Sequence, residues 1–531
     1  MTSVSFLVAQ QLAACASEVF GVMGNGNAYF IDALSRAGMR FTALRHEAGG
    51  VAAADGYFRA SGHLAIATTT YGPGFTNALT PLAEAVRAST PMVLVVGSAP
   101  LVGARTWDVD QTALATAVGA PTVQVTVGTP MRDTARAVEL ALTRRAPVVL
   151  AIPYDIASVE TRPEPPVRAV QLPSPPVPDV DGAARILADA RRVLILAGRG
   201  AWLDHAEEPL AELAERLGAV TATTALAAGL FGHSSTDLGI AGGFGTDDAA
   251  AVMHAADVVL VAGASLTQFT TRFDTLFAPD AHILQIDLAE RSTHPQVDVL
   301  LTGSVRATTR ALLSRIPAGS RPCWISDIPG GRFAEFNGDS LAPDGRLDPR
   351  ALATALDAAL PANRTVVQDG GHFIGWAPGY WHIPSPDRLI MVGTAFQSIG
   401  LGFPSAVGAA IALPDTTTVL CTGDGGGLMA LSDFETFIRT ARSGVVVVFN
   451  DAAYGAELHQ YEHLDHAAML IPETNFCLLG RALGAVGTVV ECLDDLSVLS
   501  SWDRRGVLVL DCRISRSIVA PFLEEWMHAA R

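Results

Sequence analysis

Residues 417–427 read Thr-Thr-Val-Leu-Cys-Thr-Gly-Asp-Gly-Gly-Gly, an apolar run that ends in a glycine-rich turn around one acid, Asp424. About 26 residues further on, a second apolar run, 445–449, ends in Asn450-Asp451. Both runs have the length and composition of buried strands, so each acid is expected at a strand end. Two carboxylates at neighbouring strand ends, with glycines between them, predict a site for a divalent metal and a phosphate group.

The chemistry of such a site is specific. Magnesium prefers about six oxygen ligands and usually shares its site with phosphate oxygens. Gly425 to Gly427 would let the backbone approach an anion, and Leu428 to Thr440 are expected to form a helix whose N-terminus faces it. For Gly-Asp-Gly alone, a tight turn with a solvated Asp is the alternative. The strand before it, the helix after it and the second acid favour a cofactor site.

Length and composition limit the class of protein. The chain has 531 residues, more than one core usually supports, so two to four domains are expected. Hydrophobic residues make up 49% and charged residues 17%, which predicts a soluble protein with large buried sheets. No apolar stretch reaches the roughly 18 residues that a membrane span needs. Met1 to Gln11 lacks the basic segment of a signal peptide, so we expect a cytoplasmic protein.

Charge and residue usage exclude several functions. The net charge of -17 argues against nucleic-acid binding, because phosphate backbones attract basic surfaces. The sequence contains no lysine, so all 36 basic residues are arginine, which excludes a lysine Schiff base and a Walker lysine. The six cysteines show no Cys-x-x-Cys spacing and are expected to be buried reduced thiols.

The order of strand-like and helix-like runs predicts three α/β domains, each a doubly wound parallel sheet. They are expected at residues 1–165, 181–318 and 346–531, joined by linkers at 166–180 and 319–345 that are rich in Pro and Gly. In the first domain, strands are expected at 41–44, 65–69 and 91–96, with helices at 47–60 and 77–88. In the second, strands are expected at 193–198, 258–263 and 283–287. In the third, they are expected near 365–367, 389–392, 417–421, 445–449 and 507–510.

Four motifs, in this order, resemble those of thiamine-diphosphate enzymes of the acetolactate synthase, 2-oxo acid decarboxylase and benzaldehyde lyase type. They are Arg45 to Tyr57, Gly72-Pro73-Gly74-Phe75-Thr76-Asn77, Ile399 to Pro404, and Gly423-Asp424-Gly425 with Asn450-Asp451. The resemblance covers nearly the whole chain. It implies that the three domains are a pyrimidine-binding, a central and a diphosphate-binding domain.

The resemblance also implies roles for individual residues. Glu47 would be catalytic: its carboxyl would contact the cofactor pyrimidine and so support loss of the weakly acidic thiazolium C2 proton. Asp424, Asp451 and the carbonyl of Ala453 would bind Mg2+, and Ile399 would hold the cofactor bent. The cofactor-binding positions implied by the resemblance are Pro73, Asn77, Gly371, His372, Gln397, Ser398, Ile399, Gly423, Asp424, Gly425, Gly426, Asp451, Ala453, Tyr454 and Gly455.

Two further expectations follow from the resemblance. Many relatives carry Asn where Asp451 stands, so the extra charge beside the diphosphate predicts a stronger dependence on divalent metal here. In such enzymes the pyrimidine-side and diphosphate-side domains meet across a subunit interface. A homodimer or homotetramer is therefore expected, with active sites at the interface and an inactive monomer.

The substrate side departs from the best-known relatives. Residues 21–27 lack the paired histidines of pyruvate decarboxylases, so release of an aldehyde through a histidine proton relay is less expected. Asn25, Gly26 and Asn27 in this stretch either line the substrate pocket or form a plain turn. Trp107 stands where acetolactate synthases have Gln, and their Lys has no counterpart here. Gln111 remains a candidate pocket residue.

Other candidates lie further along the chain. Glu457 and His459 follow the metal loop, and they face either the second substrate or solvent on a helix. Residues 518–526 are a candidate lid. After the strand that ends at Gly263, the next arginine is only Arg272, so FAD is not expected in the central domain.

The function predicted from the sequence is that of a thiamine-diphosphate-dependent lyase or carboligase. It would decarboxylate a 2-oxo acid and transfer the acyl-anion equivalent to a second carbonyl compound. A benzaldehyde-lyase-like enzyme acting on 2-hydroxy ketones and a non-oxidative 2-oxo acid decarboxylase are the alternatives. A flavin-dependent oxidase and a non-catalytic subunit are less favoured.

Overall fold

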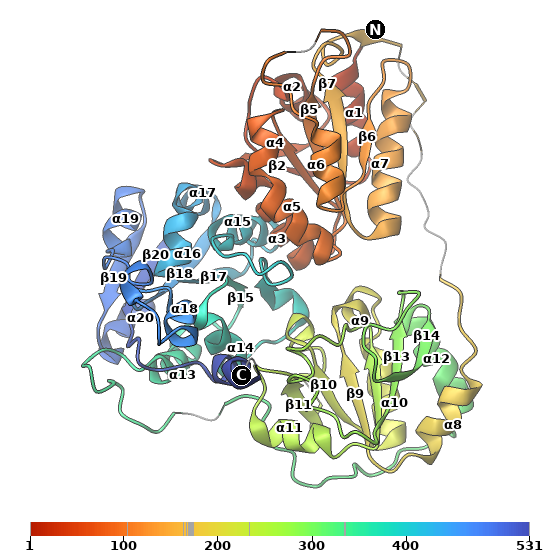
Figure 1. Cartoon of the computed structure of the whole chain (residues 1–531), viewed down its shortest axis with the longest axis vertical. Helices are drawn as coiled ribbons and strands as arrows, with labels where there is room; N and C mark the ends of the chain where they lie inside the picture. The colour runs from red at the N-terminus through yellow and green to blue at the C-terminus, as the bar shows by residue number, and fades with distance from the viewer. Residues whose placement is uncertain are drawn as a thin grey trace.

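The computed structural model describes residues 2–103, 105–162, 164–165, 167, 175–232, 234–333 and 336–529. These residues form three α/β domains, each built on a six-stranded sheet whose strands are all parallel. Figure 1 shows them as three lobes, the first domain at the top, the third at the left and the central domain at the lower right. The predicted fold class is therefore confirmed. In the described part of the chain, no helix is long and apolar enough to span a bilayer.

The first domain has the strand order β3-β2-β4-β5-β7-β6. Its two longest strands, β5 and β7, are rich in β-branched residues and almost wholly buried, as expected for a parallel sheet with helices on both faces. The strands are β2 Glu18–Gly21, β3 Arg40–Ala43, β4 Ala65–Thr69, β5 Met92–Ser98, β6 Thr122–Gln124 and β7 Pro147–Pro153, with β1 Thr2–Ser3 paired to β8 Glu160–Thr161. The helices are α1 Val4–Leu12, α2 Ala28–Arg36, α3 Glu47–Ser61, α4 Pro73–Asn77, α5 Leu79–Arg87, α6 Gln111–Ala117 and α7 Pro130–Arg144.

The central domain has the order β11-β10-β9-β12-β13-β14. Its inner strands β9 and β12 are buried along their whole length. The strands are β9 Val193–Ala197, β10 Val220–Thr223, β11 Asp237–Ile240, β12 Val258–Ala262, β13 His282–Asp287 and β14 Val297–Thr302. The helices are α8 Asp181–Asp189, α9 Arg199–Leu203, α10 Glu207–Leu217, η1 Ala225–Ala227, α11 Asp247–His254 and α12 Val305–Arg315.

The third domain has the order β16-β15-β17-β18-β20-β19. β15 is flanked by β16 on one side and by β17 on the other, so the strand order reverses direction at β15. In parallel sheets of this kind a crevice forms at that point, here between the carboxyl ends of β15 and β17. The strands are β15 Arg364–Gln368, β16 Leu389–Met391, β17 Thr417–Gly423, β18 Ser443–Asn450, β19 Val486–Val490 and β20 Gly506–Arg513. The helices are α13 Pro349–Ala359, η2 His372–Gly375, α14 Trp376–Tyr380, η3 Pro386–Arg388, α15 Gly402–Ala412, α16 Asp424–Met429, α17 Leu431–Thr440, α18 Gly455–Gln460, η4 His466–Ala468, α19 Phe476–Ala482, η5 Leu493–Ser497, α20 Val498–Ser501 and α21 Pro521–Ala529.

Two predicted helices have other bounds in the structure. The helix expected at 428–440 begins earlier, because α16 starts at Asp424 and runs through the three glycines, and it breaks at Ala430 before α17. The helix expected at 77–88 is likewise two helices, α4 and α5. In α16 the glycines are buried, so packing against neighbours outweighs their low helix propensity.

Two other sequence expectations are tested only in part. Residues 166 and 168–174 of the first predicted linker, and 334–335 of the second, lie outside the described residues, and the domain boundaries stay predictions. All six cysteines are free thiols. The expectation that they are buried is wrong for Cys492, which is exposed at the start of η5, and Cys15 and Cys323 are only half-buried.

Helices α3 and α15 join the first domain to the third. Gly56 and Gly408 lie at their crossing: a Cβ on Gly408 would lie 1.9 Å from the carbonyl oxygen of Ala53, and one on Gly56 would lie 2.5 Å from that of Ser405. Only glycine permits this approach of backbone to backbone. The apolar faces of the two helices belong to one hydrophobic core that spans both domains.

Candidate active site

Asp424 and Asp451 lie at the carboxyl ends of two adjacent parallel strands. In the register of β17 and β18, Gly423 is paired with Phe449, so the residues that follow these strands emerge at the same edge of the sheet. Asp424 is the first residue of α16 and is 1% exposed, and Asp451 is 6% exposed. The predicted convergence of the two acids is therefore present.

The two carboxyl groups are buried without full hydrogen bonding. Asp451 Oδ1 accepts the Ala453 N–H at 3.1 Å, whereas Asp424 Oδ2 is buried and has no hydrogen-bond partner. Burial, followed by the neighbouring charge of Asp451, raises the pKa of Asp424, and burial also raises the pKa of Asp451. A divalent cation would relieve this strain, so the donor set fits Mg2+. Among the described residues, no third His, Cys, Asp or Glu completes a metal cluster.

The backbone beside Asp424 has no room for side chains. A Cβ on Gly425 would lie 2.7 Å from the ring of Tyr454, and one on Gly426 would lie 2.9 Å from Asp369 Oδ2. Glycine is therefore required here by close packing against Tyr454 and Asp369, and the predicted approach of this backbone to an anion stays a prediction.

Asp369 is a residue of the crevice that the sequence argument did not single out. It follows β15, and its Oδ1 accepts hydrogen bonds from Gly370 N, Gly400 N and Leu401 N, while Oδ2 accepts one from the Thr422 hydroxyl. Asp369 therefore ties three segments of the crevice together. The signal was an acid shortly after the short strand-like stretch 365–367 and directly before two glycines, a pattern similar to that at Asp424.

His372 is held by the C-terminal segment. Its Nε2 accepts the Ala520 N–H at 2.8 Å, and its ring lies 4.8 Å from that of His459. Burial, and then His459, lower the pKa of His372 to about 3, so the ring is neutral and Nε2 is an acceptor. The predicted contact of His372 with a diphosphate would therefore have to use the other ring nitrogen, Nδ1, as a donor; it stays a prediction.

A cavity of about 1610 Å³ opens in front of these residues. The C-terminal helix α21 borders it through Phe522 and Trp526, and Phe522 packs edge-on against Phe244 and Phe269 of the central domain. The predicted site residues that line it are Gly371, His372, Gln397, Ser398, Ile399, Gly423, Asp424, Gly425, Gly426, Asp451, Ala453, Tyr454, Gly455 and Glu457. The cavity also reaches residues 263–265 and 267–270 of the central domain, the domain in which the sequence predicts no flavin.

The predicted residues of the first domain lie apart from this cavity. Glu47 begins α3 and is half-buried, and its Oε2 accepts a hydrogen bond from Asn77 Nδ2 at 3.0 Å. Pro73 is exposed at the start of α4, the helix that ends at Asn77. Two residues of α3 border the cavity, Phe58 and Arg59, near the other end of the helix. At 1.5 Å rise per residue, roughly 18 Å separates Glu47 from Arg59. The structure thus divides the predicted site into two groups.

The substrate candidates of the first domain are mostly engaged with backbone. The Asn27 side chain bonds Gly24 N, the Val22 carbonyl and the Thr68 hydroxyl, which matches the plain-turn interpretation, and Gly26 N–H donates to the Thr70 hydroxyl. Gln111 Oε1 accepts from Gly72 N, and its Nε2 donates to the Gly97 carbonyl, so it holds the loop before α4. Asn25 and Trp107 are exposed.

The two titratable candidates on α18 differ. Glu457 is exposed and borders the cavity. His459 is half-buried beside His372, its Nε2 has no hydrogen-bond partner, and burial lowers its pKa.

Family models match all three domains. The N-terminal TPP binding domain of thiamine pyrophosphate enzymes matches residues 2–117, their central domain matches 180–312, and their C-terminal TPP binding domain matches 369–502. The chain belongs to the thiamine pyrophosphate enzymes. The family resemblance and the enzyme class predicted from the sequence are thereby confirmed.

Several members of the thiamine pyrophosphate enzymes are similar to this chain. A probable acetolactate synthase large subunit of Methanocaldococcus jannaschii is 28% identical over 84% of this chain and 79% of its own length. A sulfoacetaldehyde acetyltransferase of Castellaniella defragrans is 26% identical over 98% and 94%. A solved thiamine diphosphate-dependent 4-hydroxybenzoylformate decarboxylase of Rhodococcus jostii has a TM-score of 0.82 at 20% identity over 97% and 99%, which supports the fold. These relatives differ in their reactions, so the family leaves the substrate open.

Proposed function

We propose that this thiamine pyrophosphate enzyme decarboxylates a 2-oxo acid and transfers the acyl-anion equivalent to a second carbonyl compound. The observation that carries the proposal is the buried, unpartnered Oδ2 of Asp424 beside Asp451, two residues that border the cavity. This pair of carboxylates needs a cation, and a cation there would in turn hold a diphosphate. The acetolactate synthases among the relatives support the carboligase reaction.

The residues present fit thiamine diphosphate with Mg2+. Asp424, Asp451 and the carbonyl of Ala453 would bind the metal, and the backbone at Gly425 and Gly426, which borders the cavity, would take the diphosphate. Ile399, which is 36% exposed and borders the cavity, would support the bent cofactor. When bound, the cofactor supplies an electron sink for the bond broken on decarboxylation.

Glu47 would serve a cofactor held by a second copy of the chain. Its carboxyl lies near the end of α3 remote from its own cavity and is oriented by Asn77. A carboxyl placed against the cofactor pyrimidine can hold a proton there and so control the charge of the ring. We therefore propose a homodimer, or a homotetramer built from such dimers, with each site completed across the interface.

A non-oxidative decarboxylase is the second candidate. Glu457 is the observation that favours it, because an exposed carboxyl at the cavity could deliver the proton that releases an aldehyde. The loop 21–27 supplies no histidine for that step, which favours transfer to a carbonyl acceptor instead.

The reaction is tested with a panel of 2-oxo acids, each with and without an aldehyde or 2-oxo acid acceptor. Carbon dioxide is followed, and the products are identified by mass spectrometry. The proposal expects carbon dioxide together with a product that joins the donor, less its carboxyl carbon, to the acceptor: a 2-hydroxy ketone from an aldehyde or a 2-hydroxy-3-oxo acid from a 2-oxo acid. Carbon dioxide with aldehyde alone would select the decarboxylase, and ketone formed from two aldehydes without carbon dioxide would select a benzaldehyde-lyase-like enzyme.

The role of Glu47 is tested separately. Glu47→Gln keeps the size of the side chain and its contact with Asn77 but cannot exchange a proton. We expect this variant to bind thiamine diphosphate by calorimetry while its turnover is lost. Full turnover in Glu47→Gln would refute the assignment.

A further inference from the structure

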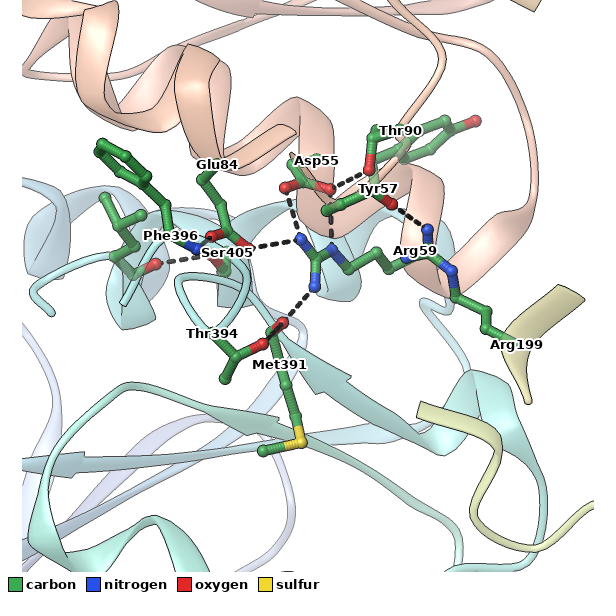
Figure 2. A network of polar contacts seen from close by, with 12 residues as sticks. Asp55, Tyr57, Arg59, Glu84, Thr90, Arg199, Met391, Thr394, Phe396 and Ser405 are labelled. Carbon is green, nitrogen blue, oxygen red and sulfur yellow. Dashed lines mark hydrogen bonds and ion pairs between the residues drawn. The ribbon is translucent and has the colours of Figure 1, made fainter. Parts of the chain in front are cut away.

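Arg59 lies at the centre of a buried ion network in the first domain (Figure 2). Its Nε and Nη2 donate to the two oxygens of Asp55 at 2.8 and 2.9 Å, and Nη2 also donates to Glu84 Oε1 at 2.8 Å. The three residues are 3%, 0% and 0% exposed, respectively. Burial alone would lower the pKa of Arg59, but the two carboxylates raise it, so the guanidinium is charged.

This network reaches across the domain boundary to the third domain. Arg59 Nη1 donates to the carbonyl of Met391, the last residue of β16, and Glu84 Oε2 accepts the Phe396 N–H at 2.6 Å. Figure 2 shows Arg59 beside Met391 and Glu84 beside Phe396, so α3 contacts the end of β16 and α5 contacts the turn after it. Two charged side chains of the first domain, Arg59 and Glu84, therefore each hydrogen-bond a backbone group of the third domain.

The loop 393–399 follows Met391 and contains Phe396, the two residues whose backbone these contacts hold. Gly393, Gln397, Ser398 and Ile399 of this loop border the cavity that also contains Asp424. The loop has no helix or strand, and Gln397 has a φ of +56°, which costs a residue other than glycine about 1 kcal/mol or more. A shape of this kind persists only when neighbours fix it.

Carboxylates fix the loop from both sides. Asp369 accepts the N–H groups of Gly400 and Leu401 at one end, and Glu84 accepts that of Phe396 in the middle. Only a carboxylate can accept hydrogen bonds on both of its oxygens, from Arg59 on one and from Phe396 on the other. Burying ions is a poor route to stability alone, but it specifies geometry when every partner is satisfied.

We propose that Glu84, oriented by Arg59, is a positioning residue for the cofactor: it fixes the loop 393–399, and thereby Gln397 and Ile399, in the shape that receives thiamine diphosphate. The proposal rests on the proposed cofactor site. Glu84 acts through the loop and does not border the cavity itself. The loop is thus shaped before the cofactor arrives, which reduces the entropy lost on binding.

Glu84→Gln is the informative variant, and Thr90→Val is its matched control. The amide has the size of the carboxyl but accepts through one oxygen only, so it must give up either Arg59 or Phe396. Thr90 donates to Asp55 Oδ1 at 2.8 Å in the same network, but it does not contact the loop. A loss of network stability would affect both variants, whereas a loss of loop positioning would affect Glu84→Gln alone.

Hydrogen exchange in the protein without cofactor is the first measurement. In the wild type, the Phe396 amide should exchange more slowly than those of Ala395 and Gln397. In Glu84→Gln its exchange should accelerate about tenfold or more, with residues 424–430 unchanged and Thr90→Val like the wild type. Equal exchange of Phe396 in the wild type and Glu84→Gln would overturn the proposal, as would equal acceleration in Thr90→Val.

Calorimetric binding of thiamine diphosphate with Mg2+ is the second measurement. Glu84→Gln should bind about tenfold more weakly, and Thr90→Val should bind like the wild type. A loosened loop with unchanged affinity would also overturn the positioning role. Failure of the wild type to bind the cofactor would instead contradict the proposed cofactor site, and the exchange result would still decide whether Glu84 fixes the loop.

Discussion

Replacing Gly408 with alanine is expected to force α3 and α15 apart. The new Cβ would lie 1.9 Å from the carbonyl oxygen of Ala53, and contacts of a Cβ below 3.0 Å are essentially never seen. The atom met is backbone, so it cannot rotate away, and the helices must separate by about 1 Å. Overpacking of this kind costs about 1–3 kcal/mol, against about 0.5–1 kcal/mol regained by removing a glycine from a helix.

We therefore expect Gly408→Ala to lower the free energy of unfolding by about 1 kcal/mol, and by no more than about 2.5 kcal/mol, measured by urea denaturation of the protein without cofactor. Gly182→Ala is the control, because Gly182 lies in α8 and a Cβ there meets nothing within 4 Å. That variant should be as stable as the wild type or slightly more stable. The reasoning is refuted if Gly408→Ala unfolds at the same or a higher urea concentration than the wild type.

Three other outcomes are expected. Burial raises the pKa of Asp237 to about 6 from 3.8, so the charged carboxylate destabilises the fold as pH rises through that value. Asp237→Asn should therefore raise the unfolding temperature near pH 8 and leave it almost unchanged near pH 4. An equal shift of the unfolding temperature at both pH values would contradict this. Asp451→Asn removes a charge beside the predicted diphosphate, so the affinity for thiamine diphosphate should depend less on Mg2+ concentration in a magnesium titration. The same dependence on Mg2+ as in the wild type would show that this charge is irrelevant. The purified protein should lack the visible absorbance of flavin, and a yellow protein would overturn that expectation.

The strand ends were predictable because parallel strands are buried, apolar and short. Asp424 and Asp451 stand directly after such runs, so their convergence followed from sheet geometry alone. The start of α16 was not predictable, since three glycines oppose a helix; they are helical here because Tyr454, Asp369 and Phe476 pack against them.

Side-chain partners distant in the sequence could not be predicted. Gln111 bonds Gly72, 39 residues away, and Glu84 bonds Phe396, 312 residues away, so no local pattern reports either contact. A pocket role for Gln111 was a reasonable expectation from its place in the chain. The structure shows instead that both ends of its amide hold backbone, and a direct contact with substrate stays a prediction.

The distance between Glu47 and its own cavity makes the enzyme a candidate for complementation between chains. Glu47→Gln and Asp424→Asn would each be inactive alone, but they damage different halves of a site. In a mixed dimer, one site would receive both mutations and the other would receive none. After the chains exchange, about a quarter of all sites should therefore be intact and activity should return to that level. Two inactive proteins would become an active mixture without any new residue being added.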